Sequence, residues 1–329
     1  MHKLISRLAK TRELMLLAVV ALVFIAMCFA SEYFFSSANL LAVLLTLSME
    51  AIMVVGMVNL MVSGGFDMSV GAIVALSGGI TALLIKAGVP IPLCLIGGLA
   101  GGALVGLWNG FAIAKLGITP FVTTLSSQSM CRGLVLVSMN GLNISGLPES
   151  FTWIGQHKLG VVQLPVIYAL VFMLIGQWLL KKSRFFRQNY YIGGNFKAAK
   201  LSGIRTERMQ IINYMIMGVL AAFAGIVLTA RLGSASTTAG QGMELKVITA
   251  VIIGGASMSG GEGTVVGAFL GCVLMALIAN AMTLLNVTVY WQTFVTGFTL
   301  LVAVLIDRYG KIKQENRKDT SKIGNEVNV

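Results

Sequence analysis

Residues 41–71 read LAVLLTLSMEAIMVVGMVNLMVSGGFDMSVG, an apolar run followed at once by a glycine-rich and polar break. The run over 41–62 is long enough for one transmembrane helix, which needs about 20 apolar residues. In the break, Gly64 and Gly65 free the backbone, while Asp67 and Ser69 are residues that favour a helix N-terminus. The stretch therefore predicts a spanning helix, an interruption and a second helix. Two interpretations of the break are open. It caps the second helix at the cytoplasmic boundary and has no further role, or it contacts a substrate or gates a path.

The rest of the chain has the same apolar character. Of its 329 residues, 57% are hydrophobic and only 11% are charged, whereas a soluble domain carries about 25% charged residues. This composition argues against a soluble globular enzyme and against disorder, which needs low hydrophobicity. The apolar runs are continuous, whereas a membrane β-barrel shows alternating segments of about 10 residues. We therefore expect an all-α, polytopic inner-membrane protein.

Windows of about 19 residues predict about ten transmembrane helices. They divide the chain into a basic N-terminal segment (1–13), a transmembrane domain (14–307) and a C-terminal tail (308–329). A cleaved signal peptide is the alternative for the first apolar segment, which is long for that role and is followed by further spans. The ten segments are 14–30, 41–62, 70–86, 91–113, 118–138, 163–180, 211–230, 244–258, 264–286 and 290–307.

Basic residues predict the orientation. Most of the 24 lysines and arginines lie in 1–13, 181–208 and 308–329. The positive-inside rule places all three segments in the cytoplasm, which an even number of ten spans satisfies. We expect a multi-pass protein of the bacterial inner membrane with both termini cytoplasmic. The net charge of +12 is therefore interpreted as a topology signal at the lipid bilayer, and no nucleic-acid partner is expected.

A second break resembles the first. Residues 64–71 (GGFDMSVG) and 254–261 (GGASMSGG) both fit the pattern GG-x-x-MS-x-G. Two such breaks would fit an internal repeat, which is common in transporters, although coincidence in a glycine-rich chain is the alternative. The candidate helix-break or gating residues are Gly64, Gly65, Asp67, Ser69, Gly254, Gly255, Gly260 and Gly261.

Uncharged polar residues within the predicted spans are candidates for a substrate path. Amide and hydroxyl groups suit a polyhydroxylated, uncharged solute, because its hydroxyls both donate and accept hydrogen bonds. The alternative is that these groups satisfy one another across helices. The chain shows no ladder of carboxylates or histidines of the kind that proton relays use. The path candidates are Asn59, Ser63, Asn109, Gln128 and Asn280.

The loop over 181–210 contains a short predicted helix. Asn195 can cap it, Phe196 to Ser202 favour it, and Gly203 can end it. Because so short a helix is marginal in water, we expect it to dock, either on a soluble partner or on its own membrane domain.

No catalytic or metal-binding constellation is present in the sequence. There is no G-x-x-x-x-G-K-[ST] phosphate loop, and the four cysteines lack paired spacing. With only two histidines, a metal site is not expected. We therefore expect a passage for a solute, not an enzyme, with no cofactor on this chain.

Four long motifs together resemble a known family. They occur in order at 63–71 (SGGFDMSVG), 106–134 (GLWNGFAIAKLGITPFVTTLSSQSMCRGL), 187–204 (RQNYYIGGNFKAAKLSGI) and 243–271 (MELKVITAVIIGGASMSGGEGTVVGAFLG). Over roughly 40–307 the chain resembles the membrane permease subunits of ribose-type ABC importers of simple sugars, in the branched-chain amino acid/ribose permease superfamily.

The resemblance implies partners and a coupling element. It implies a second permease copy or a homologous permease, a cytoplasmic ABC ATPase that holds ATP and Mg²⁺, and a periplasmic sugar-binding protein. Phe186 and Tyr191 depart from the glycine and alanine usual in relatives, which could alter the choice of ATPase. A stand-alone secondary transporter or channel, or a receptor without transport, are the alternatives. The implied coupling residues are Arg187, Gly193, Gly194, Asn195, Ala198, Ala199, Leu201 and Gly203.

Overall fold

The computed structural model describes residues 2–326, with side-chain burial defined for residues 12–309 and Ile312. The chain is almost entirely helical, with one short hairpin. The elements are α1 (His2–Ala30), α2 (Ser37–Val62), α3 (Val70–Lys86), α4 (Ile91–Ala114), α5 (Pro120–Ser138), α6 (Glu149–Gln156), β1 (Lys158–Leu159), β2 (Val162–Gln163), α7 (Leu164–Lys182), α8 (Arg184–Gly194), α9 (Phe196–Leu201), α10 (Thr206–Leu232), α11 (Met243–Ile253), α12 (Val265–Leu284) and α13 (Val289–Glu326).

The all-α membrane fold is confirmed in its coarse form. Among the described residues, seven helices are long and apolar enough to cross a membrane: α1, α2, α4, α7, α10, α12 and α13. The predicted count of ten is not confirmed. Each of the other three predicted segments overlaps a helix, but α3 has 17 residues and α11 has 11, and α5 is less apolar than the seven. The helices α3 and α11 are too short to be counted because each adjoins a break.

The predicted boundaries at 13/14 and 307/308 fall inside helices. α1 continues through the first and α13 through the second. The sequence analysis also did not anticipate α6, the hairpin or α8 as separate elements.

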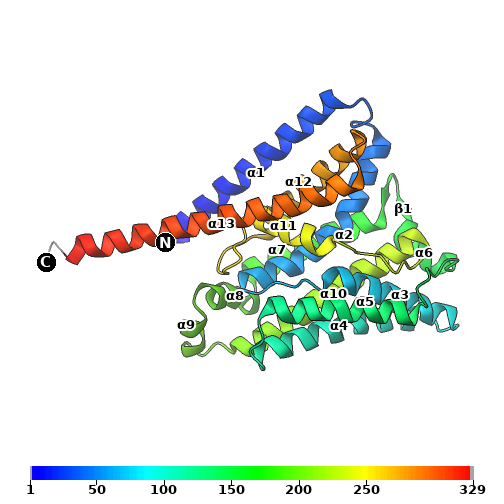
Figure 1. Cartoon of the computed structure of the whole chain (residues 1–329), viewed down its shortest axis with the longest axis horizontal. Coiled ribbons are helices and arrows are strands. Elements are labelled where there is room, and N and C mark those ends of the chain that lie inside the picture. Colours follow the sequence, from blue (N-terminus) through cyan, green and yellow to red (C-terminus); the bar gives the residue numbers. More distant parts are fainter. Residues whose placement is uncertain (1, 327–329) are drawn as a thin grey trace.

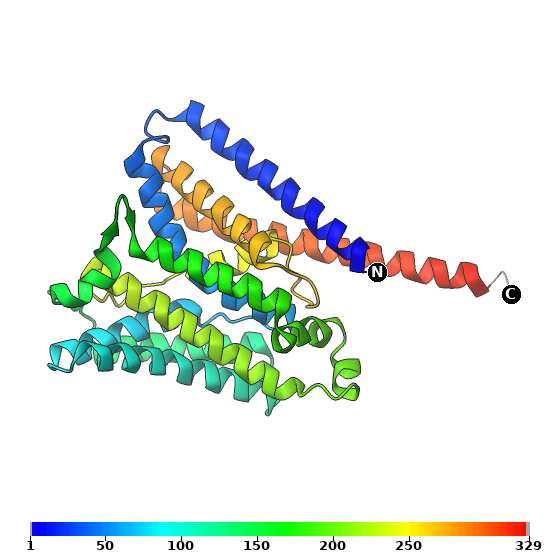
Figure 2. The same cartoon turned by 180° about the vertical axis from the view of Figure 1, so that it is seen from behind.

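The three basic segments gather at one end of the molecule. The start of α1, the last part of α13, and α8 with α9 lie on the left in Figure 1 and on the right in Figure 2. The hairpin and α6 lie at the opposite end. The positive-inside prediction places these three segments on one side of the membrane, and their gathering at one end is consistent with it, while the side itself stays a prediction.

α10 lies at the centre and packs against α2, α3, α4 and α6. Its contact with α4 depends on glycines spaced four residues apart. A Cβ atom on Gly102, Gly106 or Gly110 would overlap α10, on Gly110 at 2.7 Å from the Cα of Ile211. Small residues at this spacing let two helix backbones approach closely, as is common in membranes.

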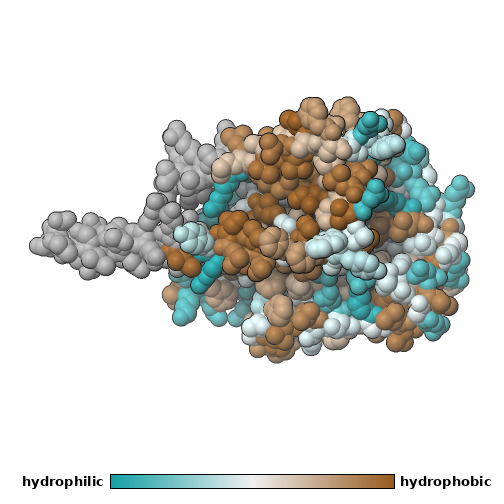
Figure 3. Space-filling model, turned by 45° about the horizontal axis from the view of Figure 1, so that its top comes forward, coloured by the Kyte–Doolittle hydropathy of each residue, from teal (hydrophilic) through white to brown (hydrophobic). Residues whose placement is uncertain are grey.

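α1 and α13 lie on the outside and bury little of their surface. Large side chains such as Phe29, Trp291 and Phe298 are exposed there. Figure 3 shows a broad hydrophobic area on this side of the molecule. A surface of this size and composition suits contact with lipid, since soluble proteins expose only small apolar patches.

Candidate functional site

The short helix predicted in the 181–210 loop is α9, and its caps are as expected. The Asn195 side chain accepts a hydrogen bond from the backbone N–H of Ala198 at 3.0 Å. Gly203 adopts a positive φ of 82°, and the N–H of Ile204 returns to the carbonyl of Ala199 at 3.1 Å. Local capping therefore decides where this helix begins and ends.

α9 has one anchored side and one free side. Ala199 is buried in a small cluster with Ile192 of α8 and Met209 of α10. Leu201, by contrast, is 89% exposed. The helix thus docks on its own membrane domain through one side, and docking of its exposed side on a soluble partner stays a prediction.

A cleft of about 470 Å³ lies between α8 and α9. Several of the implied coupling residues line it, while Arg187 is exposed on α8. Glu207 at the start of α10 links α9 to the end of α4, because its carboxylate accepts hydrogen bonds from Lys200 of α9, at 3.3 Å, and from Lys115, which follows α4. The lining residues from the implied coupling set are Gly194, Asn195, Ala198 and Ala199.

The end of α8 meets both helix breaks. A Cβ on Gly193 would overlap the carbonyl oxygen of Val62 and would lie 2.5 Å from the backbone N of Gly261. The N–H of Gly261 donates to that same Val62 carbonyl at 2.9 Å. A Cβ on Gly260 would lie 3.0 Å from the N of Gly64. We call this contact of Gly64, Gly193, Gly260 and Gly261 the glycine junction.

Both breaks end their preceding helix with a glycine of positive φ, but that glycine is at a different position of the shared sequence pattern in each break. After α2, Gly64 takes the positive φ (86°) that closes the helix; after α11, Gly255 does so (92°). The shared pattern pairs Gly64 with Gly254 instead, whose φ is −65°. The match therefore aligns residues that are not structurally equivalent, and an internal repeat stays a prediction.

Two tyrosines tie the breaks to neighbouring helices. The hydroxyl of Tyr190 on α8 donates to the carbonyl of Gly263 at 2.7 Å, and the hydroxyl of Tyr214 on α10 donates to that of Phe66 at 3.0 Å. The sequence predicted neither contact, since Tyr190 is an ordinary aromatic within the 187–204 motif and Tyr214 lies in an apolar segment outside the four motifs.

Asp67 lies fully buried in the first break. Its Oδ1 accepts from the backbone N–H of Ser69 at 2.7 Å and from the Ser69 hydroxyl. Ser69 Oγ accepts from Asn109, whose Oδ1 accepts from Ser127 at 2.6 Å. Asp67 therefore holds the residue that precedes α3, and it does not bond to the first turn of that helix. The prediction that Asp67 or Ser69 caps α3 through its side chain is therefore not confirmed: Ser69 occupies the N-cap position without a capping hydrogen bond, and Asp67 binds Ser69 instead.

Two substitutions of Asp67 test whether the protein needs the hydrogen bonds of this side chain to Ser69 or its negative charge. Asp67→Asn keeps an oxygen acceptor and should be mild, because Oδ2 has no described partner to lose. Asp67→Leu strands the two Ser69 donors, at about 1–3 kcal/mol for each buried unsatisfied group, and should lower folded yield. Yield by size-exclusion chromatography and sugar uptake check both variants. Loss of uptake in Asp67→Asn at normal yield would show that the charge itself is needed.

The predicted path residues all bond to other parts of the protein. Asn109 belongs to the Asp67 network, Gln128 donates to Glu244 at 3.0 Å, and Asn280 pairs with Asn39 at 2.7 Å. Their contacts favour the alternative that they satisfy one another across helices. Their role in a substrate path stays a prediction.

Asn59 and Ser63 belong to a buried amide cluster that joins three helices. Asn189 of α8 donates to Asn59 of α2 at 2.6 Å, and Asn59 donates to Asn213 of α10 at 2.8 Å. Asn213 donates back to Asn189 at 2.9 Å and also reaches Ser63. All of these side chains are buried, so the cluster fixes α8 to the core. Sequence reasoning missed Asn189 and Asn213, because nothing local distinguishes them from other asparagines.

These features define a polytopic α-helical membrane protein in which a small exposed helical element is joined to two broken helices. The sequence profile described as the branched-chain amino acid transport system / permease component matches residues 39–304, and the chain belongs to this family. The resemblance that four motifs indicated is thereby confirmed.

Individual relatives agree over most of their length. The chain is 38% identical to the ribose import permease protein RbsC of Bacillus subtilis (strain 168), covering 84% of this chain and 86% of the relative. It is 32% identical to the xylose transport system permease protein XylH of Haemophilus influenzae (91% and 96%). It is 34% identical to the D-allose transport system permease protein AlsC of Escherichia coli (strain K12) (89% and 90%).

Proposed function

We propose that this chain is the permease subunit of an ATP-binding cassette importer that moves a monosaccharide or a sugar-like solute across the bacterial inner membrane. One observation carries the proposal: α9 presents Leu201 to solvent while α8 is joined to both helix breaks through the glycine junction. The printed names of the relatives, which are import permeases for ribose, xylose and allose, support the solute class.

The orientation follows from charge. The end that carries α8, α9 and both termini faces the cytoplasm, because lysine and arginine gather there. An even number of crossings includes α3, α5 and α11 as spans, with the irregular stretches 63–69 and 254–264 completing the short helices α3 and α11. The end with α6 and the hairpin then faces the periplasm, where a sugar-binding protein delivers the solute.

The mechanism is mechanical, since ATP and Mg²⁺ belong to separate ATPase subunits. An ATPase subunit contacts α9, and its ATP-driven movement displaces α8. The glycine contacts leave no space between Gly193 of α8, the end of α2 at Val62 and the second break at Gly260 and Gly261, so displacement of α8 moves both breaks together. In a pair with a second permease, this alternates access between the two sides.

Reconstitution tests this function. Proteoliposomes that hold the chain with its ATPase subunit facing the lumen should accumulate labelled monosaccharide only when ATP is inside and the sugar-binding protein is outside. Liposomes with the chain alone should show no uptake. Flux through the chain alone, down a gradient or with an ion, would make it a stand-alone transporter; binding-protein capture without flux in the full system would make it a receptor.

A further inference from the structure

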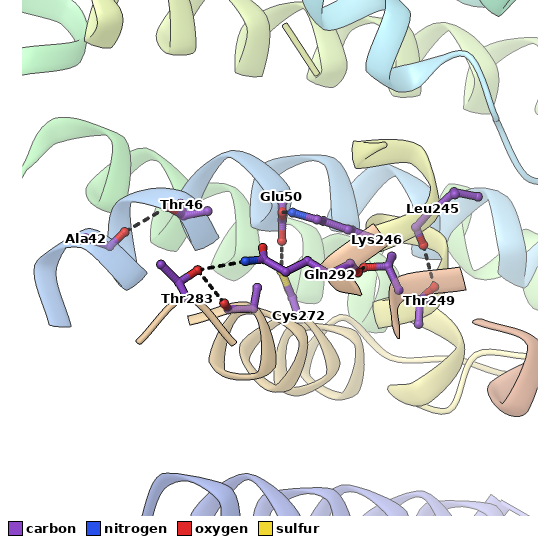
Figure 4. A network of polar contacts seen from close by, with 11 residues as sticks. Ala42, Thr46, Glu50, Leu245, Lys246, Thr249, Cys272, Thr283 and Gln292 are labelled. Atoms are coloured by element: carbon purple, nitrogen blue, oxygen red, sulfur yellow. Dashed lines mark hydrogen bonds and ion pairs between the residues drawn. The ribbon is translucent and has the colours of Figure 1, made fainter. Parts of the chain in front are cut away.

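An ion pair lies at the middle of the membrane-spanning region, outside the coupling machinery. Glu50 stands halfway along α2 and is almost fully buried. The Nζ of Lys246 on α11 lies 3.6 Å from its Oε1. Figure 4 shows the pair between α2 and α11, with Cys272 of α12 close to the other carboxylate oxygen.

The Lys246 side chain is not enclosed by this chain. It is 35% exposed although it pairs with a buried carboxylate. A charged side chain at the centre of a bilayer costs about 3 kcal/mol or more, and such residues face a bundle interior or a water-filled cavity. Lys246 also points to Glu50 at mid-span, so it is not reaching toward a lipid headgroup about 15 Å away.

One more polar group lies near the pair. Thr46, one helical turn before Glu50 on α2, is exposed. The exposed side of α7 is different, because it carries large apolar side chains that suit lipid. They include Leu170, Val171, Leu174, Ile175 and Trp178.

We propose that the side of α2 and α11 carrying Glu50 and Lys246 faces the water-filled solute path, and that Lys246, held in place by Glu50, binds hydroxyl groups of the passing solute. The accessible ammonium donates to hydroxyl oxygens of a polyhydroxylated molecule, while the buried carboxylate positions the ammonium and balances its charge. Because the pair is neutral overall, it suits an uncharged solute. This assignment rests on the proposed importer function, and it names the solute-facing side that the function requires.

Cysteine labelling tests the location without relying on transport. Of the four cysteines, all within the described residues, only Cys28 is exposed, so Cys28→Ser is the background. In nanodiscs, Lys246→Cys should react with a charged, membrane-impermeant methanethiosulfonate ~tenfold or more faster than the matched control Leu174→Cys, because only an aqueous thiol ionises readily. Leu174 lies at mid-span on α7 and is 72% exposed.

A second probe keeps the ion pair intact. Thr46→Cys replaces an exposed hydroxyl, leaves Glu50 and Lys246 unchanged, and should also label faster than Leu174→Cys. Equal, slow labelling of Thr46→Cys and Leu174→Cys in folded protein would overturn the proposal, whatever Lys246→Cys does. If labelling is fast but the Cys28→Ser background shows no ATP-dependent uptake, the proposed function fails and the aqueous location stands.

Solute contact has its own readout. In the full reconstituted system, Lys246→Gln with Glu50→Gln should lower sugar uptake ~tenfold, about 1.4 kcal/mol, while ATP hydrolysis stimulated by the loaded binding protein persists. The exchanged pair, Glu50→Lys with Lys246→Glu, should recover part of the uptake. Wild-type uptake by the double glutamine variant would refute solute binding by Lys246.

Discussion

Leu201→Asp should leave the protein in the membrane at normal yield and abolish both sugar uptake and ATPase stimulation. Leu201 is 89% exposed at the end of α9, so the fold loses almost no packing when it is replaced. In an interface with an ATPase, burying a leucine contributes about 1.5–3 kcal/mol, and an unpaired carboxylate there costs several kcal/mol more. Association with the ATPase should therefore weaken by roughly 100-fold or more.

Pull-down of the ATPase subunit and uptake in proteoliposomes measure this effect. Leu201→Met preserves apolar volume and should retain near-normal activity. If Leu201→Asp still retained the ATPase and transported sugar, α9 would not be the contact that transmits the movement.

Gly193→Val should impair folding and transport, whereas Gly194→Val should leave folding nearly unchanged. A Cβ on Gly193 would overlap backbone atoms of both breaks, while one on Gly194 would meet no described atom within 4 Å. Because backbone cannot move aside as a flexible side chain does, overpacking at Gly193 should cost about 1–3 kcal/mol. The valine would also separate the Gly261 N–H from the Val62 carbonyl.

The neighbouring glycines form a matched pair for this test. Both end the same helix and receive the same side chain, so differences in helix propensity cancel. Thermal unfolding in detergent and the sugar transported per ATP hydrolysed are the two measurements. Identical unfolding and transport for the two variants would show that the glycine junction does not link α8 to the breaks.

Local features of the sequence determined the positions of the helices. Apolar runs of membrane-spanning length appear as helices because only an internally hydrogen-bonded backbone is stable in lipid. Asn195 and Gly203 bound α9 as expected, since a capping side chain and a residue with positive φ act within one turn. The family resemblance depended on four motifs in order, and the profile match over 39–304 confirmed it.

The sequence pattern did not predict which residues of the two breaks are structurally equivalent. The pattern GG-x-x-MS-x-G suggested that Gly64 corresponds to Gly254, but the residue with positive φ in the second break is Gly255. Which glycine closes a helix depends on where the preceding hydrogen bonds end, and the letters alone do not fix that position.

The sequence by itself therefore determined the membrane class, the helix breaks and the short capped helix α9, since each depends on composition or on neighbours within a few residues. Only the tertiary structure decided which of these meet. Asn59, Asn189 and Asn213 are far apart along the chain, yet they share one buried amide cluster. Gly193 meets both breaks, and Glu50 meets Lys246, because helix packing brings distant segments together. Such contacts arise from the shapes of whole helix faces, and no local signal in the sequence specifies the partner.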